Sequence, residues 1–200
     1  MPEIGPIIVL QVQVSSLKVG EAPRKRYDPR PLLPVPALEL DPDGAIGLPA
    51  DGSRVVDVHH LRHAATKQRR GLNGLSIGFT SHYAEMRDRF DNALPDGMAG
   101  ENILVGTDRH WTEEELAPGL AIVTKAGRRL AIERVMVAAP CVEFTRWAMR
   151  FPDDGRPDRT VTEGVRFLDH GMRGYYAAYD GEPVTIAVGD RVFVRDQGGQ

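Results

Sequence analysis

Short apolar segments bounded by glycine-containing turns make up most of the second half of this chain. Valine, isoleucine and tyrosine are frequent in them, and segments of this length and composition are typical of β-strands. They cover residues 119–123, 129–137, 173–179, 184–188 and 191–195. Only short helical patterns, near 143–150 and 161–168, lie among them, whereas a doubly wound parallel sheet needs regular crossover helices. The pattern therefore predicts a mainly β fold with short helices, and among such folds a β-barrel.

The first half of the chain adds further elements. VLQVQV at 9–14 alternates apolar and polar residues, which predicts a strand with one apolar face. That face carries Leu10, Val12 and Val14. We expect two more short strands, at 55–58 and 103–105.

Two segments carry the signals of a helix N-terminus. TSHYAEMRDRFDNA at 80–93 predicts a helix whose N-cap is Thr80 or Ser81. Its buried face is expected to carry Tyr83, Met86 and Phe90. TEEE at 112–115 matches a capping box and predicts a single helical turn.

Residues 21–52 are dense in proline, glycine and charge. EAPRKRYDPRPLLPVP is followed by DPDGAIGLPADG, and such residues interrupt both helices and strand ladders. We expect this stretch to form a surface excursion, either a functional loop or an insertion. A chain of 200 residues suffices for one core, so we expect a single domain over 1–200 with its core at about 55–195.

Charge and hydropathy argue against several classes of protein. The 25 basic and 28 acidic side chains give no electrostatic basis for binding nucleic acid or an anionic membrane. No apolar run approaches the roughly 20 residues of a membrane helix, and the first residues lack the features of a signal peptide. We therefore expect a cytoplasmic protein. The sequence does not indicate which oligomeric state it has.

Cys141 is the single cysteine of the chain. It has no partner for an intramolecular disulfide and cannot contribute to a cage of several cysteines. It is therefore either a small buried hydrophobic residue or a working thiol. A working thiolate suits two roles, because soft sulfur binds molybdenum well and a thiolate is the form that accepts a persulfide sulfur.

Three segments of the chain form a recognisable set. They are GMAGENILV at 97–105, VAAPCVEF at 137–144 and FLDHGMRGYYAAYDGEPVTIAVGDRV at 167–192. A GEN turn before a strand, a Pro-Cys step after an alternating strand, and a G-x-R-G-x-Y segment before a closing Gly-Asp resemble, in this order, the MOSC domain family. That family comprises domains like the C-terminal domain of molybdenum cofactor sulfurase, and the chain is similar to its free-standing bacterial members. VDVHHLRH at 56–63 and SHY at 81–83 are looser similarities.

The resemblance implies a β-barrel and a role in molybdenum chemistry. It implies that Cys141 either ligates the metal of a molybdenum–pterin cofactor, in an oxidoreductase that reduces N-hydroxylated compounds, or accepts sulfur for cofactor maturation. The first role needs a small-molecule substrate and an external reductase, because no flavin, haem or iron–sulfur motif is present; the second needs a cysteine desulfurase. The pyridoxal-phosphate desulfurase fused to some family members has no counterpart here, so this chain is not expected to bind pyridoxal phosphate.

Four residues around these motifs are candidate cofactor contacts. Gly100 permits a turn whose N–H groups face an anion, and the Asn102 amide offers a donor and an acceptor. Glu101 more simply ties down the loop. The planar fork of Arg173, between two glycines, suits a phosphate. The alternatives are an ordinary tight turn with a self-bonding asparagine, and a solvated arginine.

The histidines of the chain suggest weaker sites. In HHLRH at 59–63 the first and last histidines lack a third metal ligand or an HExxH motif, so zinc is not favoured. We expect His60 and Arg62 to contact a cofactor phosphate or a substrate, with a polar surface turn as the alternative. His82 is either an acid or base near the pocket or, more simply, a surface histidine at a helix N-terminus.

Other functions remain open at this stage. A non-catalytic module that binds a pterin or a metal has the same sequence features as the oxidoreductase. A Cys–His hydrolase is disfavoured because no nucleophile motif surrounds Cys141.

Overall fold

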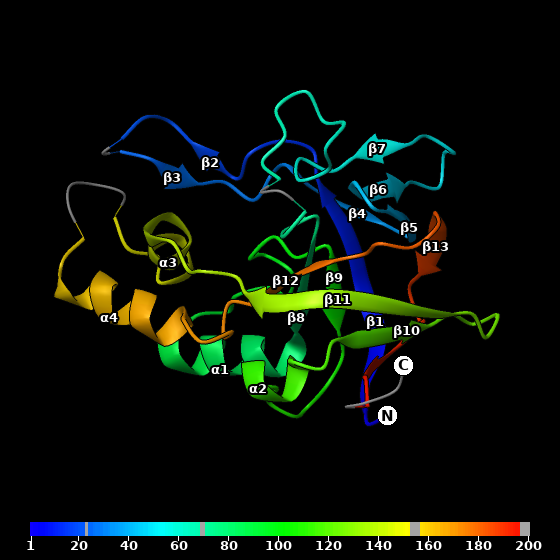
Figure 1. Cartoon of the computed structure of the whole chain (residues 1–200). Coiled ribbons are helices and arrows are strands. Elements are labelled where there is room, and N and C mark those ends of the chain that lie inside the picture. Colours follow the sequence, from blue (N-terminus) through cyan, green and yellow to red (C-terminus); the bar gives the residue numbers. More distant parts are fainter. Residues whose placement is uncertain (23, 69–70, 153–156, 197–200) are drawn as a thin grey trace.

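Seven strands close into a β-barrel in this computed structural model, which describes residues 1–22, 24–68, 71–152 and 157–196. Around the barrel they run β14 (Arg191–Val194), β10 (Leu120–Val123), β11 (Arg129–Val137), β12 (Tyr175–Ala178), β8 (Leu75–Phe79), β9 (Ile103–Val105) and β1 (Glu3–Gln13). Strand β1 then pairs with β14 and closes the ring. All neighbours are antiparallel except β8 and β9. The barrel predicted from the strand pattern is confirmed (Figure 1).

Strand β1 joins the barrel to the rest of the fold. Its first residues pair with β14, its middle with β9, and its last four with β4 (Leu32–Val35). Leu10 and Val12 are buried as the alternation predicts, but Val14 lies beyond the strand and is 40% exposed. The alternate residues Gln11 and Gln13 are also buried. The polar face of this strand therefore meets other parts of the protein and not solvent.

The range 21–52 was wrongly predicted as a surface excursion. It contains β3 (Arg26–Tyr27), which pairs with β2 (Lys18–Val19), then β4, β5 (Ala37–Asp41) and β6 (Gly44–Leu48). Strands β5 and β6 belong to a second sheet, whose strand order is β13 (Val184–Ala187), β5, β6 and β7 (Val55–Val56). Leu38 and Leu40 are fully buried in the main core. The prolines do not interrupt these sheets, because Pro34 lies in the edge strand β4 and Pro36 between two strands.

Four helices occur in the described part of the chain: α1 (Thr80–Phe90), α2 (Glu113–Leu116), α3 (Val142–Ala148) and α4 (Arg159–Leu168). The capping box predicted for α2 is confirmed. The cap predicted for α1 is wrong, because its N-cap is Phe79 with no side-chain hydrogen bond. The Thr80 hydroxyl is bound instead to the backbone of Thr107. None of these helices is long and apolar enough to cross a membrane.

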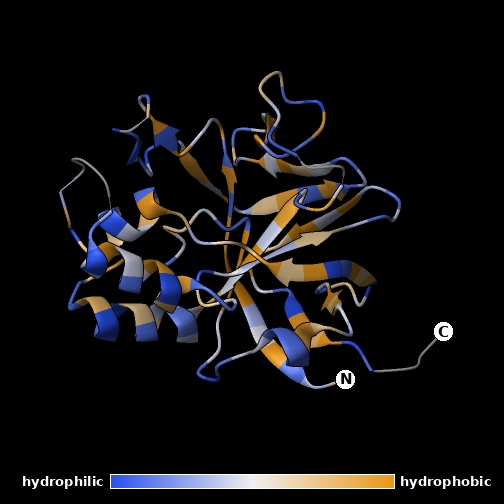
Figure 2. Cartoon of the chain, turned by 60° about the vertical axis from the view of Figure 1, so that its left-hand side comes forward, coloured by the Kyte–Doolittle hydropathy of each residue, from blue (hydrophilic) through white to orange (hydrophobic). Residues whose placement is uncertain are grey.

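Two apolar clusters support the fold. One fills the barrel and continues under the second sheet. The other lies between the barrel and the helices, with Tyr83, Phe144 and Leu168 among its buried residues and Cys141 packed at its margin. Helices α1, α3 and α4 gather on one side of the barrel (Figure 1), and their outer faces are largely hydrophilic (Figure 2).

Candidate functional site

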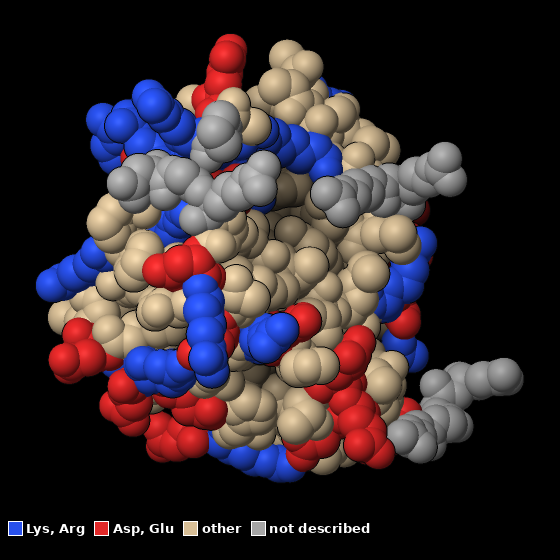
Figure 3. Space-filling view, turned by 90° about the vertical axis from the view of Figure 1, so that its left-hand side faces the viewer, with Lys and Arg blue, Asp and Glu red and all other residues tan. Residues whose placement is uncertain are grey.

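A pocket opens where the barrel, the β2–β3 hairpin and the start of α3 meet. Its volume is about 90 Å³, or about 580 Å³ when its open mouth is included. Four of the predicted site residues line it: Gly100, Glu101, Cys141 and Arg173. On the face that carries α3 and α4, the surface is hollowed near its centre and Lys and Arg gather above the hollow (Figure 3).

Cys141 is held in the pocket wall with its side chain half-buried. It is the N-cap of α3, and its Sγ accepts a hydrogen bond from the backbone N–H of Phe144 at 3.5 Å. Its carbonyl accepts from the N–H and the hydroxyl of Thr145. The backbone at Cys141 is thus fixed while the sulfur remains at the pocket.

Glu143 is the acidic neighbour of this thiol. Lys18 Nζ lies 3.4 Å from the Glu143 carboxylate. Burial raises the pKa of Glu143, but its own N–H, Lys18 and the thiol lower it more, so the net pKa lies below its ordinary value. Glu143 therefore remains an ionised carboxylate beside Lys18.

Arg173 is aimed by the two glycines that flank it. Gly171 and Gly174 have φ of +91° and +121°, which L side chains rarely adopt. A Cβ on Gly171 would lie 2.0 Å from the Tyr175 hydroxyl, and one on Gly174 would lie 2.8 Å from the Ile77 carbonyl. Both positions therefore require glycine, which gives the G-x-R-G-x-Y pattern a physical basis.

The Arg173 guanidinium is only partly occupied by protein groups. Its NH2 donates to the Ala99 carbonyl at 2.9 Å, its centre lies 5.9 Å from the Phe144 ring, and its buried Nε has no hydrogen-bond partner among the described residues. Burial lowers the pKa of Arg173, but Tyr176, Tyr27 and other acidic groups raise it more, so the net pKa is raised. Arg173 is a permanent cation in the pocket wall.

Glu101 lies at the floor of the pocket and is only 4% exposed. Its two carboxylate oxygens lie 2.8 and 2.9 Å from the Tyr83 hydroxyl, which donates to them. Burial raises the pKa of Glu101 to about 7, although its own N–H, Tyr83 and Arg173 act in the opposite direction. This carboxyl group can therefore gain or lose a proton near neutral pH.

Asn102 does not lie in the pocket wall, contrary to the predicted cofactor contact. Its Oδ1 accepts from the N–H and the hydroxyl of Ser76, both at 3.0 Å. Its Nδ2 donates to the Gln11 carbonyl at 3.2 Å and to Asp57 Oδ2 at 2.9 Å. These bonds use the whole amide, so Asn102 holds the loop to the barrel and leaves nothing to offer a ligand.

His59, and not His60, faces the pocket. Its Nδ1 lies 3.1 Å from Asp57 Oδ1, and the same Asp57 accepts from Asn102. The predicted site residues His60 and Arg62 lie outside this pocket, because both side chains are bound to Asp41 in a different cluster. The HHLRH segment is a turn, and no sequence period indicates which histidine points inward.

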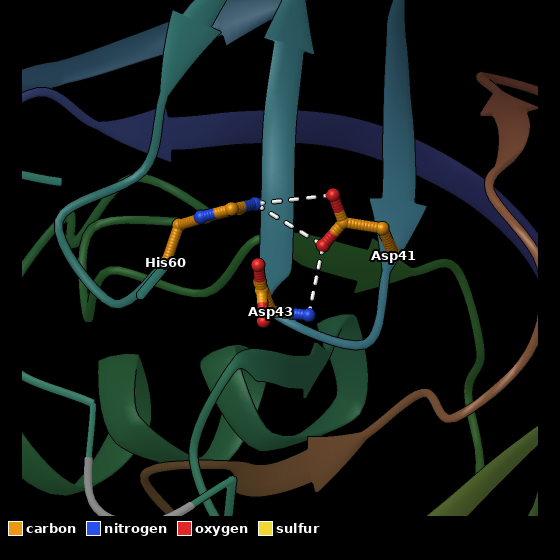
Figure 4. A group of neighbouring side chains, drawn as sticks. All are labelled: Asp41, Asp43 and His60. Atoms are coloured by element: carbon orange, nitrogen blue, oxygen red, sulfur yellow. Dashed lines mark hydrogen bonds and ion pairs between the residues drawn. The ribbon is translucent and has the colours of Figure 1, made fainter. Parts of the chain in front are cut away.

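The other cluster combines Asp41, Asp43 and His60, whose possible ligand atoms lie within 4.8 Å of one another (Figure 4). One oxygen of Asp41 accepts from the N–H groups of Asp43 and Gly44, and the other accepts from Arg62 at 2.5 Å. His60 Nδ1 accepts from the Arg62 N–H at 3.0 Å, so we place the ring proton on Nε2, which faces Asp41. This closed network does not leave a nitrogen lone pair for a metal.

Lysines surround the mouth of the pocket. Lys18 and Lys67 line it, and Lys67 Nζ donates to the Ser16 hydroxyl at 2.7 Å. Partial burial lowers the pKa of Lys67, and the nearby Lys18 and Lys25 lower it further. Such mutual repulsion shows that positive charge is concentrated here. Nothing in the motifs identified these lysines, because Lys18 lies in β2 and Lys67 in a loop, both outside the motif segments.

His82 fits neither of the two roles expected from the sequence. It is 1% exposed, so it is not a surface residue, and it does not line the pocket. Its Nδ1 donates to the Gly171 carbonyl and its Nε2 accepts from the Trp111 N–H. Burial and the nearby His110 lower its pKa to about 4. His82 is therefore a neutral structural residue that supports the loop before Arg173.

Two solved structures share this fold. The YuaD protein from Bacillus subtilis is 15% identical, the match covers 96% of this chain and 94% of that chain, and the TM-score is 0.58. YiiM from Geobacillus stearothermophilus is 13% identical, with 96% and 76% covered and a TM-score of 0.54. At these identities the likeness shows the fold alone. No protein-family model matches the chain, and neither does any curated protein.

Proposed function

We propose that this chain is a MOSC-type protein that binds a molybdenum–pterin cofactor in the pocket, with the Cys141 thiolate as ligand to the metal. The observation that carries the proposal is that the half-exposed sulfur of Cys141 shares one pocket with the cation of Arg173. The motif segments at 97–105, 137–144 and 167–192 all contribute to that pocket. The likeness to YuaD and YiiM supports the assignment at the level of the fold.

The chemistry of the pocket suits such a cofactor. A thiolate is a soft ligand of the kind that binds molybdenum, and the free edge of the Arg173 guanidinium matches a phosphate. Lys18 and Lys67 add positive charge at the mouth. When bound, the cofactor supplies two-electron oxygen-transfer chemistry.

The residues of the chain hold and prepare the ligand. The N–H of Phe144 stabilises negative charge on the Cys141 sulfur. Arg173 is fixed by the Ala99 carbonyl and holds an anionic group. Reduction of N-hydroxylated small molecules is the reaction that we propose, with electrons from a separate reductase.

A sulfur carrier is the second candidate function. The same reachable sulfur and its Phe144 N–H donor suit a persulfide on Cys141, which a cysteine desulfurase would supply. Under this alternative Arg173 binds an anionic part of the acceptor. The chain would then carry sulfur without turning over a substrate of its own.

Metal analysis separates the two functions. Protein purified from a host that makes the molybdenum cofactor is expected to contain roughly one molybdenum per chain, and Cys141→Ser is expected to lose most of it. Arg173→Lys should bind less, because a point charge does not replace the planar fork. Arg62→Lys is the matched control, since Arg62 lies outside the pocket, and it should retain the metal.

The opposite result would identify the alternative. A protein that never contains molybdenum, but gains one sulfur on Cys141 after treatment with a cysteine desulfurase, is a carrier. Intact mass spectrometry of the wild type and Cys141→Ser measures that sulfur directly.

A further inference from the structure

Glu101 is a buried carboxyl group for which the barrel leaves space. It precedes β9 and packs against Gly78 of β8 and Gly174 before β12. A Cβ on Gly78 would lie 2.6 Å from Glu101 Oε1. Gly78 and Gly174 thus leave room for the side chain of Glu101, because neither carries a Cβ. A carboxyl group that merely stabilised a loop would not need to reach the floor of a pocket.

Tyr83 is the hydrogen-bond donor to the Glu101 carboxylate. The Tyr83 oxygen accepts from the Ala99 N–H at 2.8 Å, so its own proton points to the Glu101 carboxylate. Tyr83 therefore donates to Glu101 and does not compete with it for a proton. Glu101 lines the pocket together with Arg173.

We propose that Glu101 is the acid–base residue of this pocket, and that it takes up one proton when an anionic ligand binds beside Arg173 and releases it when the ligand leaves. The inference rests on the proposed function only in that the ligand is anionic. One O–H bond forms on the carboxylate, the proton comes from water or buffer, and no electrons move. The same group can then exchange a proton with a bound substrate.

The charges around Glu101 explain why binding and protonation are linked. Without a ligand, the negative carboxylate partly neutralises Arg173. An anion at Arg173 takes over that role and repels the carboxylate, which favours its neutral form. The other titratable groups of this region are Tyr83 from α1, Tyr27 from β3, Asp96 from the loop before β9, and Cys141 before α3. The pocket is also lined by Lys18 of β2, Tyr176 of β12, His59 and Lys67.

The pKa of Glu101 puts this exchange in an accessible range. Burial raises it most and Asp96 adds to the rise, while its own N–H, Tyr83 and Arg173 hold it down, and the net pKa is about 7. Above that pH the free pocket must gain a proton to bind an anion, so affinity falls as pH rises. The fall is up to about tenfold per pH unit, and affinity is flat well below pH 7.

Sulfate is a suitable probe because its charge is constant across neutral pH. Calorimetric titration of the purified chain at several values between about pH 6 and pH 8 measures affinity, and buffers of different ionisation enthalpy report proton uptake. We expect uptake approaching one proton at the upper end of this range. Glu101→Gln should bind sulfate with an affinity that no longer depends on pH, and Arg173→Lys should bind weakly throughout.

Two further variants make the test specific. Glu85→Gln removes an exposed carboxylate of α1 outside the pocket and should keep the pH dependence of the wild type. Tyr83→Phe removes the hydrogen bond that lowers the pKa of Glu101. The pH above which the affinity for sulfate falls should therefore be higher in this variant. This second variant tests the proposal even if Glu101→Gln does not fold.

Three results would overturn the proposal. The first is a sulfate affinity of Glu101→Gln that depends on pH as the wild type does. The second is a fall of affinity that starts at the same pH in Tyr83→Phe as in the wild type, and the third is no sulfate binding at any pH. The assay needs no metal. Failure here is therefore distinct from failure of the proposed function, which the molybdenum content decides.

Discussion

The position of Arg173 depends on glycines at 171 and 174. Each has a positive φ, and at each a Cβ would collide with a neighbouring residue. The loop is also fixed by His82, which donates to the Gly171 carbonyl. The cation of the pocket is therefore oriented by backbone geometry and not by a paired acid.

Gly174→Ala tests this dependence. The substitution adds both conformational strain and a contact with the Ile77 carbonyl, and we expect it to lower the free energy of unfolding by about 3 kcal/mol. It should also weaken sulfate binding, because Arg173 would shift. Urea unfolding and calorimetry measure the two effects.

Gly52→Ala is the matched control. Gly52 has a φ of +80°, but nothing lies within 4 Å of the position of its Cβ. We expect only the conformational strain to act here, so the free energy of unfolding should fall by about 1 kcal/mol and sulfate should bind normally. Equal losses of stability in the two variants would show that the contact at Gly174 is unimportant.

Motifs in the sequence identify residues better than they identify roles. Cys141, Glu101 and Arg173 do meet in one pocket, as the motifs suggested. Asn102 belongs to the same motif but supports Asp57, and through it His59. A motif alone does not distinguish a residue that touches a ligand from one that positions its neighbours, because both depend on which long-range partners the fold supplies.

At the level of elements, the local sequence pattern predicted the strands of the second half of the chain but not those of 21–52. The alternation and glycine turns of β10 to β14 are local signals. Strands β5 and β6 are short and lie between prolines and glycines. They pair with each other, and β5 also pairs with β13, which is distant in sequence. Such pairing is not visible in a local pattern.

Leu40→Ala tests whether the 21–52 range belongs to the core. Leu40 of β5 is fully buried in the main apolar cluster, and we expect its truncation to lower the free energy of unfolding by about 2–5 kcal/mol. Urea unfolding, monitored by tryptophan fluorescence, measures the change.

An exposed leucine provides the comparison. Leu61 is 49% exposed in the turn after β7, and Leu61→Ala should cost less than about 0.5 kcal/mol. If Leu40→Ala cost as little as Leu61→Ala, the range would be the surface excursion that its composition predicted.

The N-terminus of α1 shows a second limit of local signals. Thr80 and Ser81 are typical N-cap residues, yet the helix begins directly after β8. Thr80 is used to bind the backbone of Thr107 next to β9. The Thr80 hydroxyl therefore makes a long-range contact and does not cap the helix.

At the scale of the whole molecule, β1 connects barrel closure to the pocket. Its first half pairs with β14, and its Gln11 and Gln13 side chains donate to the carbonyls of Gly97 and Gly100. The GEN turn therefore rests on the strand that closes the barrel. Lys18 of β2, His59 and Lys67 come from segments that follow this strand and lie outside the motifs, which explains why sequence motifs did not reveal them.

The central claim is that one sulfur of this chain ligates molybdenum in this pocket. X-ray absorption at the molybdenum edge, on protein loaded in a host that makes the cofactor, tests it most directly. We expect one Mo–S ligand more in the wild type than in any molybdenum retained by Cys141→Ser, and no difference between the wild type and Arg62→Lys. Equal Mo–S coordination in the wild type and Cys141→Ser, or a wild type that carries no molybdenum, would contradict the claim.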